Sequence, residues 1–461
     1  MIKAGFAEKV ITPPVPTYLA GYFHERIGNR VRDDLYAKAA VFEADGAQVA
    51  LVVCDLVHVT AEIVKPAKDI IAEQAGIPPE SVMISATHTH TGPEISARKV
   101  APVAVPLDSD YVARLAPTIA EAVEEAASNM FEAQLRPNTG QEAELSFNRL
   151  LRMRDGTDQF GWDGDPREVA GIAGPIDPEM VVLGIYDRGS NLRGILINFA
   201  LHVDVIGGGG ADFVSADWPG ELARAIRALY GEQVVTLFLQ GSCGDINHCT
   251  HRSTELPTAL EPKAVQLGRA LAAVAVNAVE KAEPAHDETV GSMLHTLEIP
   301  YYEVDDNLRQ TVKELKKKSP LNDFEKFLIK SVEVWPYDGQ IAQVPVQAMR
   351  IGPLGIGIVP GEIFVHWGLT IKHWSPAPYT MVVELANDTF GYIPTIEQAQ
   401  RGGYGAMPIL SRQLEASAGR IISDEVIRMM NQLWEPQLTA ASSIPANLAA
   451  ALEPYAPKQT K

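Results

Sequence analysis

The apolar positions near the start of the chain predict a hairpin of two buried strands. Residues 39–43 and 49–57 are apolar runs of strand length, and Asp45-Gly46 between them is a turn signal. The second run shows little alternation between apolar and polar side chains, which is typical of a strand with both faces covered. This segment therefore predicts part of a sheet that other elements cover.

An amphipathic helix is predicted after the hairpin. Residues 60–75 place apolar side chains at helical spacing, with Thr60 as a suitable N-cap and Gly76 as a suitable stop. A short apolar run at 82–84 follows. Strand, helix and strand in this order form a βαβ unit, which places the two strands in parallel.

The rest of the chain alternates between helical and strand patterns. Further helices are predicted at 108–130, 219–230, 262–281, 305–333 (a charged pair), 362–373 and 414–433. Further strands are predicted at 181–186, 194–200, 234–239, 289–300, 343–358 and 382–385. Residues 152–178 are rich in Gly, Asp and Arg and are predicted to form a long surface loop. The predicted fold class is α/β, with mixed β-sheets covered by helices.

Composition and charge narrow the classes of function. The chain has 461 residues, of which 46% are hydrophobic and 21% charged, an ordinary globular balance. It carries 58 acidic and 39 basic residues, a formal net charge of −19. A nucleic-acid-binding protein needs a basic face, so the charge argues against that class. We expect one domain over 1–438 and a loosely ordered tail over 439–461, which is rich in small residues and proline.

The cysteines and the N-terminal residues predict a compartment. Cys54 lies in an apolar run and is expected to be a buried thiol, whereas Cys243 and Cys249 are too far apart for a Cys-x-x-Cys pair, so no cysteine zinc site is expected. The odd, low cysteine count suits a reducing compartment. No apolar signal core and no run of bilayer length is present. We expect a cytoplasmic protein without stable membrane insertion, and the oligomeric state stays open.

Candidate chemistry centres on the polar stretch 85–94, which follows the apolar run at 82–84. His88 and His90 lie two positions apart, so their side chains point to the same side if the backbone is extended. Active sites of α/β sheets usually lie where strands end. The stretch therefore predicts a metal or proton-transfer centre. The alternative is two histidines held by hydroxyl groups in a tight loop.

Other polar side chains lie at the ends of predicted elements and have the chemistry to complete a metal site. Zinc accepts imidazole nitrogen and carboxylate oxygen, so His88, His202 and Glu362 form a possible ligand set. Glu362 is predicted at the start of a helix, where the dipole favours its charge. Each has another interpretation: His202 as a core histidine, Glu362 as a helix-terminal charge, and Tyr392 as a packed ring.

Several short motifs, in order and spacing, resemble the neutral ceramidase family. They are Ala-Thr-His-Thr-His-Thr-Gly-Pro at 86–93, Asn-Phe-Ala-Leu-His at 198–202, Gly-Asp-Ile-Asn at 244–247, Pro-Gly-Glu at 360–362 and Gly-Tyr at 391–392. The resemblance spans essentially the whole chain, starting at residue 5. It implies the catalytic domain of that family and hydrolysis of an amide with one zinc ion.

The resemblance also implies roles for individual residues. The zinc ligands fall on His88, His202, Glu362 and Tyr392. His90 handles protons, and Arg149 and Tyr404 act at the reacting carbonyl. Asp245, Asn247 and His248 are placed at the substrate pocket. With zinc activating water and polarising the carbonyl, these residue types suit amide hydrolysis.

The chain departs from the family pattern at the substrate pocket. Asn247 stands where the family has a serine, and His248-Cys249 replace the Pro-Asn that follows it. The C-terminal immunoglobulin-like domain of the family is not matched. We therefore predict a zinc hydrolase for a smaller or more polar amide. The alternatives are a zinc esterase or lactonase using the same site, and a non-catalytic metal-binding homologue.

Overall fold

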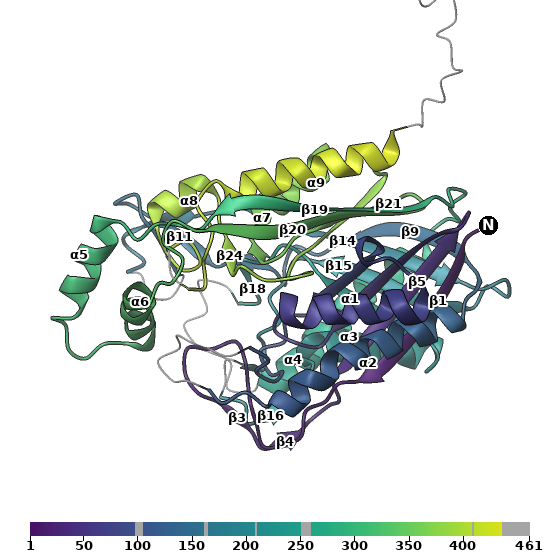
Figure 1. Ribbon diagram of the computed structural model, residues 1–461, viewed down its shortest axis with the longest axis horizontal. Coiled ribbons are helices and arrows are strands. Elements are labelled where there is room, and N and C mark those ends of the chain that lie inside the picture. The colour runs from purple at the N-terminus through teal and green to yellow at the C-terminus, as the bar shows by residue number, and fades with distance from the viewer. Residues whose placement is uncertain (97–104, 161–164, 208–209, 250–259, 408–409, 436–461) are drawn as a thin grey trace, which may run out of the picture.

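The computed structural model describes the chain except for residues 97–104, 161–164, 208–209, 250–259, 408–409 and 436–461 (Figure 1). The predicted tail over 439–461 lies outside the described residues. Among the described residues, three larger sheets form the body of the molecule. No helix among them has the length and apolar character that crossing a bilayer requires.

The first sheet contains the predicted hairpin and βαβ unit. Its strand order is β7-β6-β5-β1-β8, and its bounds are Lys3–Val10 (β1), Tyr36–Ala44 (β5), Ala47–Cys54 (β6), Val82–Ala86 (β7) and Phe131–Glu132 (β8). Asp45 and Gly46 both have positive φ, as a tight hairpin turn requires. Strands β6 and β7 pair in parallel, as predicted. Helices α1 (Ala61–Ala75) and α2 (Ser109–Ser128) pack together beside the sheet.

Helix α1 ends as predicted but begins differently. Gly76 takes the left-handed conformation with φ 70°, which only glycine adopts readily, and so closes the helix. Thr60 occupies the N-cap position but makes no side-chain cap bond. Instead, Asp388 Oδ1 accepts a hydrogen bond from the Ala61 N–H at 3.1 Å. The partner that replaces the cap lies far away in the sequence, so local pattern does not reveal it.

The second sheet has the order β17-β15-β14-β9, in which β15 and β17 are parallel. Its strands are Gln134–Gln141 (β9), Glu179–Tyr186 (β14), Leu192–Phe199 (β15) and Val235–Gln240 (β17). Helices α3 (Asp217–Tyr230) and α4 (Leu260–Glu280) pack against each other on its outer side.

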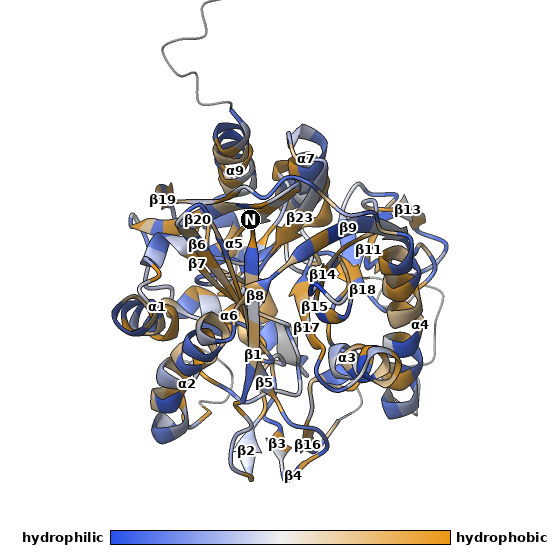
Figure 2. Cartoon of the chain, turned by 90° about the vertical axis from the view of Figure 1, so that its right-hand side faces the viewer, coloured by the Kyte–Doolittle hydropathy of each residue, from blue (hydrophilic) through white to orange (hydrophobic). Residues whose placement is uncertain are grey.

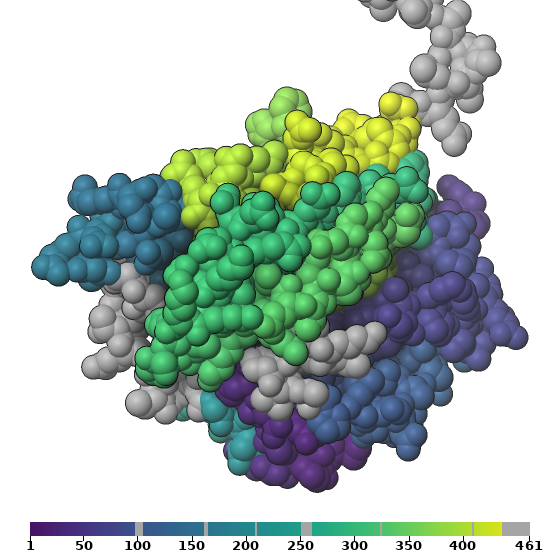
Figure 3. Space-filling view, turned by 60° about the vertical axis from the view of Figure 1, so that its left-hand side comes forward, coloured from purple at the N-terminus to yellow at the C-terminus, as the bar shows by residue number. Residues whose placement is uncertain are grey.

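The third sheet has the order β19-β20-β21-β23. Its strands are Val290–Pro300 (β19), Ile341–Ile351 (β20), Leu354–Ile358 (β21) and Tyr379–Val383 (β23). Helices α7 (Val365–Trp374) and α9 (Ala418–Trp434) cover it. Between β19 and β20 the chain forms the predicted charged helical pair, α5 (Asp306–Leu315) and α6 (Asp323–Glu333), which projects from the body (Figure 1) and comes forward in Figure 3.

The main core lies where the three sheets face one another. Seen end-on in Figure 2, the strands crowd the middle, with α1 and α2 on one side, α3 and α4 opposite, and α7 and α9 at the top. Phe42, Leu196 and Met349 come from different sheets, are fully buried, and belong to one apolar cluster. Because burial of such side chains is the dominant favourable term in folding, this cluster ties the sheets together.

In the part of the chain that the structure describes, four pairs of two-residue strands lie within the loops that connect the larger sheets. They are Thr17–Tyr18 (β2) with Ile27–Gly28 (β3), Arg30–Val31 (β4) with Phe213–Val214 (β16), Phe147–Asn148 (β10) with Ile246–Asn247 (β18), and Glu362–Ile363 (β22) with Tyr392–Ile393 (β24). The remaining short helices are Pro79–Ser81 (η1) and Ile396–Arg401 (α8).

Two predicted elements are wrong. The predicted loop over 152–178 contains β12 (Asp158–Phe160) and β13 (Val169–Ile172), which both pair with β11 (Leu150–Met153). These strands are too short and too polar for a periodic signal. Glu362 does not open a helix, because it lies in β22 and α7 begins at Val365. The argument that a helix dipole favours the charge of Glu362 therefore fails.

Candidate metal centre

The double-histidine stretch leaves the first sheet at the end of β7. The backbone is not extended there, because His88 has φ 72°. The His88 N–H still donates a hydrogen bond to the Leu56 carbonyl at 2.9 Å, so the chain after β7 stays bonded to the segment that follows β6. The two side chains nevertheless converge, with Nε2 of His88 and Nε2 of His90 3.2 Å apart. The prediction that they lie on one side is confirmed, but the extended backbone assumed for it is wrong.

The hydrogen bond of His88 determines which of its ring nitrogens has a lone pair. Nδ1 lies 2.7 Å from the Val57 carbonyl oxygen. A carbonyl only accepts, so Nδ1 carries the hydrogen and Nε2 presents a lone pair. That lone pair faces His202 Nε2 at 3.1 Å. Two buried imidazoles, 2% and 1% exposed, thus direct Nε2 atoms at one point.

His202 follows β15 of the second sheet, and its surroundings keep it neutral. Trp218 Nε1 donates a hydrogen bond to the His202 carbonyl at 3.2 Å and so holds its backbone. Burial, His88 and Arg149 lower the pKa of His202 well below its ordinary value. A neutral imidazole is the form that binds metals.

Glu362 enters from the side of the third sheet. Strands β22 and β24 pair in parallel, and this pairing sets Glu362 beside Tyr392. Its Oε2 lies 3.4 Å from His88 Nε2 and is buried without a hydrogen-bond partner among the described residues. Burial alone raises the pKa of Glu362, but His88 and Arg149 outweigh it and lower the pKa, so the group is a carboxylate.

These atoms fit a metal ion. Ligand atoms about 2.0–2.1 Å from a tetrahedral zinc lie about 3.3 Å apart. The distances from His88 Nε2 to His202 Nε2 and to Glu362 Oε2 are 3.1 and 3.4 Å. Lone pairs and a carboxylate oxygen repel one another at this distance unless a cation or proton lies between them. The donor types and the spacing therefore both suit a divalent cation.

A cysteine also lies at this point, which the sequence analysis did not predict. Among the described residues, His88, His202 and Cys243 bring ligand atoms within 4.8 Å of one another. Cys243 Sγ lies on the Nδ1 side of His202, at 3.4 Å, and its thiol donates to Glu384. No spacing motif links Cys243 to the histidines or to Glu384, so the sequence alone carried no signal for this group.

His90 is surrounded by further polar residues that no sequence motif indicates. Its Nδ1 is 3.9 Å from Asp204 Oδ1, and Arg26 Nη2 donates to its carbonyl at 2.6 Å. The Tyr22 hydroxyl bonds Asp204. Gly21 lies against the ring, where a Cβ would come within 2.3 Å of His90 Nδ1. Burial raises the pKa of Asp204 to about 6, so this carboxylate titrates near neutrality.

Arg149 and the two predicted tyrosines come together beside the centre. Arg149 Nη2 donates to the Gly244 carbonyl at 2.6 Å, and its guanidinium lies 5.4 Å from the Tyr392 ring and 4.9 Å from the Tyr404 ring. The two tyrosine hydroxyls are 3.5 Å apart. Burial, followed by Glu362, raises the pKa of Tyr392 well above its ordinary value, so its hydroxyl is protonated.

The residues predicted for the substrate pocket are tied to the protein itself. Asp245 accepts from the Val365 N–H at 2.8 Å and from Asn148 Nδ2 at 2.7 Å, so each carboxylate oxygen has a partner. Asn247 Oδ1 accepts from the His248 N–H. Burial lowers the pKa of His248 to about 4. Contact of these three residues with substrate stays a prediction.

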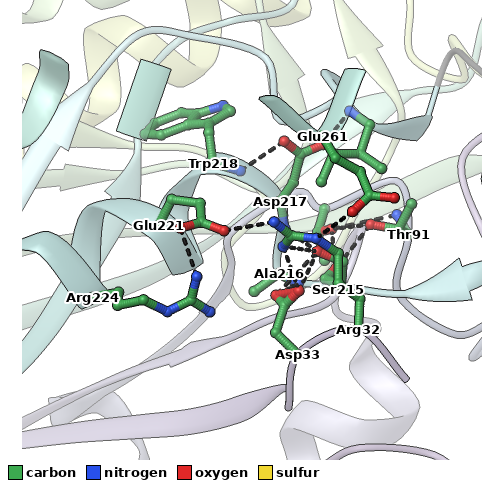
Figure 4. Close-up of polar contacts among 12 residues, drawn as sticks. Arg32, Asp33, Thr91, Ser215, Ala216, Asp217, Trp218, Glu221, Arg224 and Glu261 are labelled. Atoms are coloured by element: carbon green, nitrogen blue, oxygen red, sulfur yellow. Dashed lines mark hydrogen bonds and ion pairs between the residues drawn. The ribbon is translucent and has the colours of Figure 1, made fainter. Parts of the chain in front are cut away.

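A polar network connects the double-histidine stretch to the segment around Ser215 (Figure 4). The Ser215 carbonyl accepts from the hydroxyls of Thr89 and Thr91, each at 2.8 Å. Ser215 Oγ in turn donates to Asp33, and the adjacent Arg32 pairs with Glu221 of α3 at 2.7 Å. Since these groups are largely buried, the network fixes the loop against the N-terminal part of α3.

Comparisons with known proteins identify solved structures of similar fold. Neither a family model nor a curated protein matches the chain. A crystal structure of neutral ceramidase from Pseudomonas aeruginosa matches with a TM-score of 0.73 and 19% identity, covering 94% of this chain and 74% of that one. A structure of a ceramidase complexed with C2 matches equally well, covering 75% of its chain. The protein therefore has a neutral ceramidase-like fold, as its motifs predict.

Proposed function

We propose that the protein is a zinc-dependent hydrolase that cleaves an amide bond. The observation that carries the proposal is that His202 Nε2 and Glu362 Oε2 lie 3.1 and 3.4 Å from His88 Nε2, distances that suit neighbouring ligands of one zinc ion. Three donors of this kind leave positions for a further ligand and for substrate, as in catalytic zinc sites. Tyr392, paired with Glu362 across β22 and β24, is the proposed fourth ligand.

The roles of the remaining residues follow from where they lie. Zinc held there would polarise the scissile carbonyl and activate water. His90, with Nε2 3.2 Å from His88 Nε2, is close enough to move a proton between water and the leaving amine. Arg149 and Tyr404 supply donors for the charge that develops on the carbonyl oxygen.

The proposed substrate is a lipid amide. The two solved structures compared above are of ceramidases. Beside Arg149, the rings of Phe160 and Tyr404 lie 5.4 Å apart, and Phe23 joins Tyr404 to Phe327 of α6. Such an aromatic cluster next to a polar centre suits an acyl chain attached to an amide. The small or polar amide predicted from sequence is the alternative.

Zinc analysis of ligand variants tests the proposal. His88→Ala and Glu362→Gln should lose stoichiometric zinc and hydrolysis of N-acyl amides, whereas His373→Ala, an exposed histidine of α7, should keep both. Full zinc and full activity in either ligand variant would contradict the site. Turnover of an ester but not of the matched amide would favour the esterase, and stoichiometric zinc without any turnover would favour a binding protein.

Arg149→Met tests the role proposed for the arginine. The variant should keep its zinc but hydrolyse the amide about 10²–10³-fold more slowly, because one donor to the developing oxyanion is lost. Paired metal analysis and steady-state kinetics check this. Loss of zinc would instead give Arg149 a structural role.

A further inference from the structure

We propose that Cys243 and Glu384 are positioning residues that orient His202 and keep its Nε2 free to bind metal. The inference rests on the proposed function, because it concerns the same metal centre. Cys243 Sγ contacts His202 at Nδ1, whereas Nε2 of His202 faces His88.

The contacts form a continuous chain from Glu384 to the imidazole. The Cys243 thiol donates to Glu384 Oε1 at 2.9 Å, and the Cys243 N–H donates to Glu384 Oε2 at 3.1 Å. Cys243 Sγ then lies 3.4 Å from His202 Nδ1. Cys243 and Glu384 are fully buried. Each follows a strand, β17 and β23, so two sheets hold the pair rigidly.

The direction of these hydrogen bonds sets the tautomer of His202. The thiol hydrogen and the Cys243 N–H both go to the carboxyl group of Glu384, so the sulfur is left as an acceptor. His202 Nδ1 then carries the hydrogen and donates it to that sulfur. Nε2 is left with a lone pair, which faces His88 Nε2. The Val57 carbonyl does the same for His88.

The same geometry argues against Cys243 as a direct ligand, although its sulfur lies within 4.8 Å of ligand atoms on both histidines. A zinc-bound cysteine is a thiolate. Cys243 Sγ instead keeps its hydrogen, which it donates to Glu384, and it meets His202 at Nδ1 rather than at the Nε2 that faces His88. Glu362 Oε2, which lacks a hydrogen-bond partner among the described residues, supplies the ligand instead.

Zinc affinity of Cys243 variants tests the proposal. Cys243→Ala should bind zinc about 10–100-fold more weakly in competition with a chromogenic chelator, because outer partners of metal-binding histidines have effects of this size. Cys243→Ser should restore the affinity, since its hydroxyl can accept from Nδ1 and donate to Glu384. Cys54→Ala, at another buried free thiol, should bind zinc like the wild type.

Two further measurements do not depend on a single variant. Glu384→Ala should weaken zinc binding, and combining it with Cys243→Ala should add little, because both act through one chain of bonds. Cobalt-substituted wild type should lack the sulfur-to-cobalt charge-transfer band of a thiolate ligand. That band, or unchanged zinc affinity in Cys243→Ala, would overturn the proposal. A wild type that binds no zinc would instead overturn the proposed function itself.

Discussion

At the scale of single residues, Lys68 tests how the fold tolerates a buried charge. It lies in α1, is 6% exposed, and burial lowers its pKa to about 8 from 10.5. Below pH 8 the Lys68 amine is charged in the folded state although it is buried away from water, and this lowers the free energy of unfolding. We therefore expect Lys68→Met to raise the free energy of unfolding at pH 7, on the order of 1–3 kcal/mol.

The pH dependence gives the sign of this effect. Between pH 8 and 10.5 the unfolded chain binds more protons at Lys68 than the folded chain does, so the stability of the wild type rises with pH in that window. The advantage of Lys68→Met should shrink there, as urea unfolding at several pH values would show. Lys65→Met, at a residue whose side chain is 78% exposed on the same helix, is the control. An equal gain in both variants would contradict the argument.

Several motifs that occur together in the sequence point to residues that the structure brings to one centre, while the roles of these residues stay predictions. The residues are His88, His90, His202, Glu362, Arg149, Tyr392 and Tyr404. Cys243, Glu384 and Asp204 were not named, because their partners lie far away in the chain and no spacing connects them. Burial and hydrogen bonding, which define their roles, do not appear in the sequence.

At the scale of elements, two glycines with nearly the same backbone angle should respond differently to alanine. Gly76, which closes α1, has φ 70° and open space around a Cβ. Gly391 has φ 69°, but a Cβ there would lie 2.0 Å from the Ser411 carbonyl oxygen. Gly76→Ala should cost about 1 kcal/mol for the left-handed conformation, and Gly391→Ala about 3 kcal/mol or more.

The Gly391→Ala substitution should also affect the candidate metal centre. The Gly391 carbonyl accepts from the Glu362 N–H at 2.8 Å, so displacing it disturbs the β22–β24 pair. We expect weaker zinc binding in Gly391→Ala and unchanged binding in Gly76→Ala, measured with the unfolding free energy in the same samples. Equal stability and zinc affinity in the two variants would show that the contact with residue 411 is unimportant.

Elements with local signals were predicted well, and elements made by distant pairing were not. The hairpin, α1 and the βαβ unit follow from turn residues, helical spacing and order along the chain. The start of α7 was placed three residues too early, because Glu362 belongs to a two-residue strand whose partner is Tyr392. Such a pair contains too few residues to show a period.

At the scale of the whole molecule, the candidate metal centre combines residues that follow strands of three sheets. His88 follows β7, His202 follows β15, and Glu362 follows β21 of the third sheet. The unfolded chain cannot present these atoms together, so the proposed zinc ion would bind the folded state selectively. A ligand at 1,000 times its Kd then adds about 4.1 kcal/mol of stability.

Removal of the metal should therefore lower the melting temperature. We expect a chelator to lower the Tm of the wild type by several degrees, and added zinc to restore it. Glu362→Gln should melt at the same temperature with and without chelator. An unchanged Tm in a wild type that demonstrably loses zinc would mean that the centre does not stabilise the contact between the sheets.

The sequence by itself determined the α/β class, most of the helices and strands, and the residues at the candidate centre. These features depend on contacts between neighbours in the chain, or on motifs whose residue types carry the chemistry. Only the tertiary structure decided that His202 and Glu362 come within 3.4 Å of His88, and that Cys243, bonded to Glu384, contacts His202 at Nδ1. Distances between residues far apart in the chain depend on how the sheets pack, and packing depends on every side chain in the core.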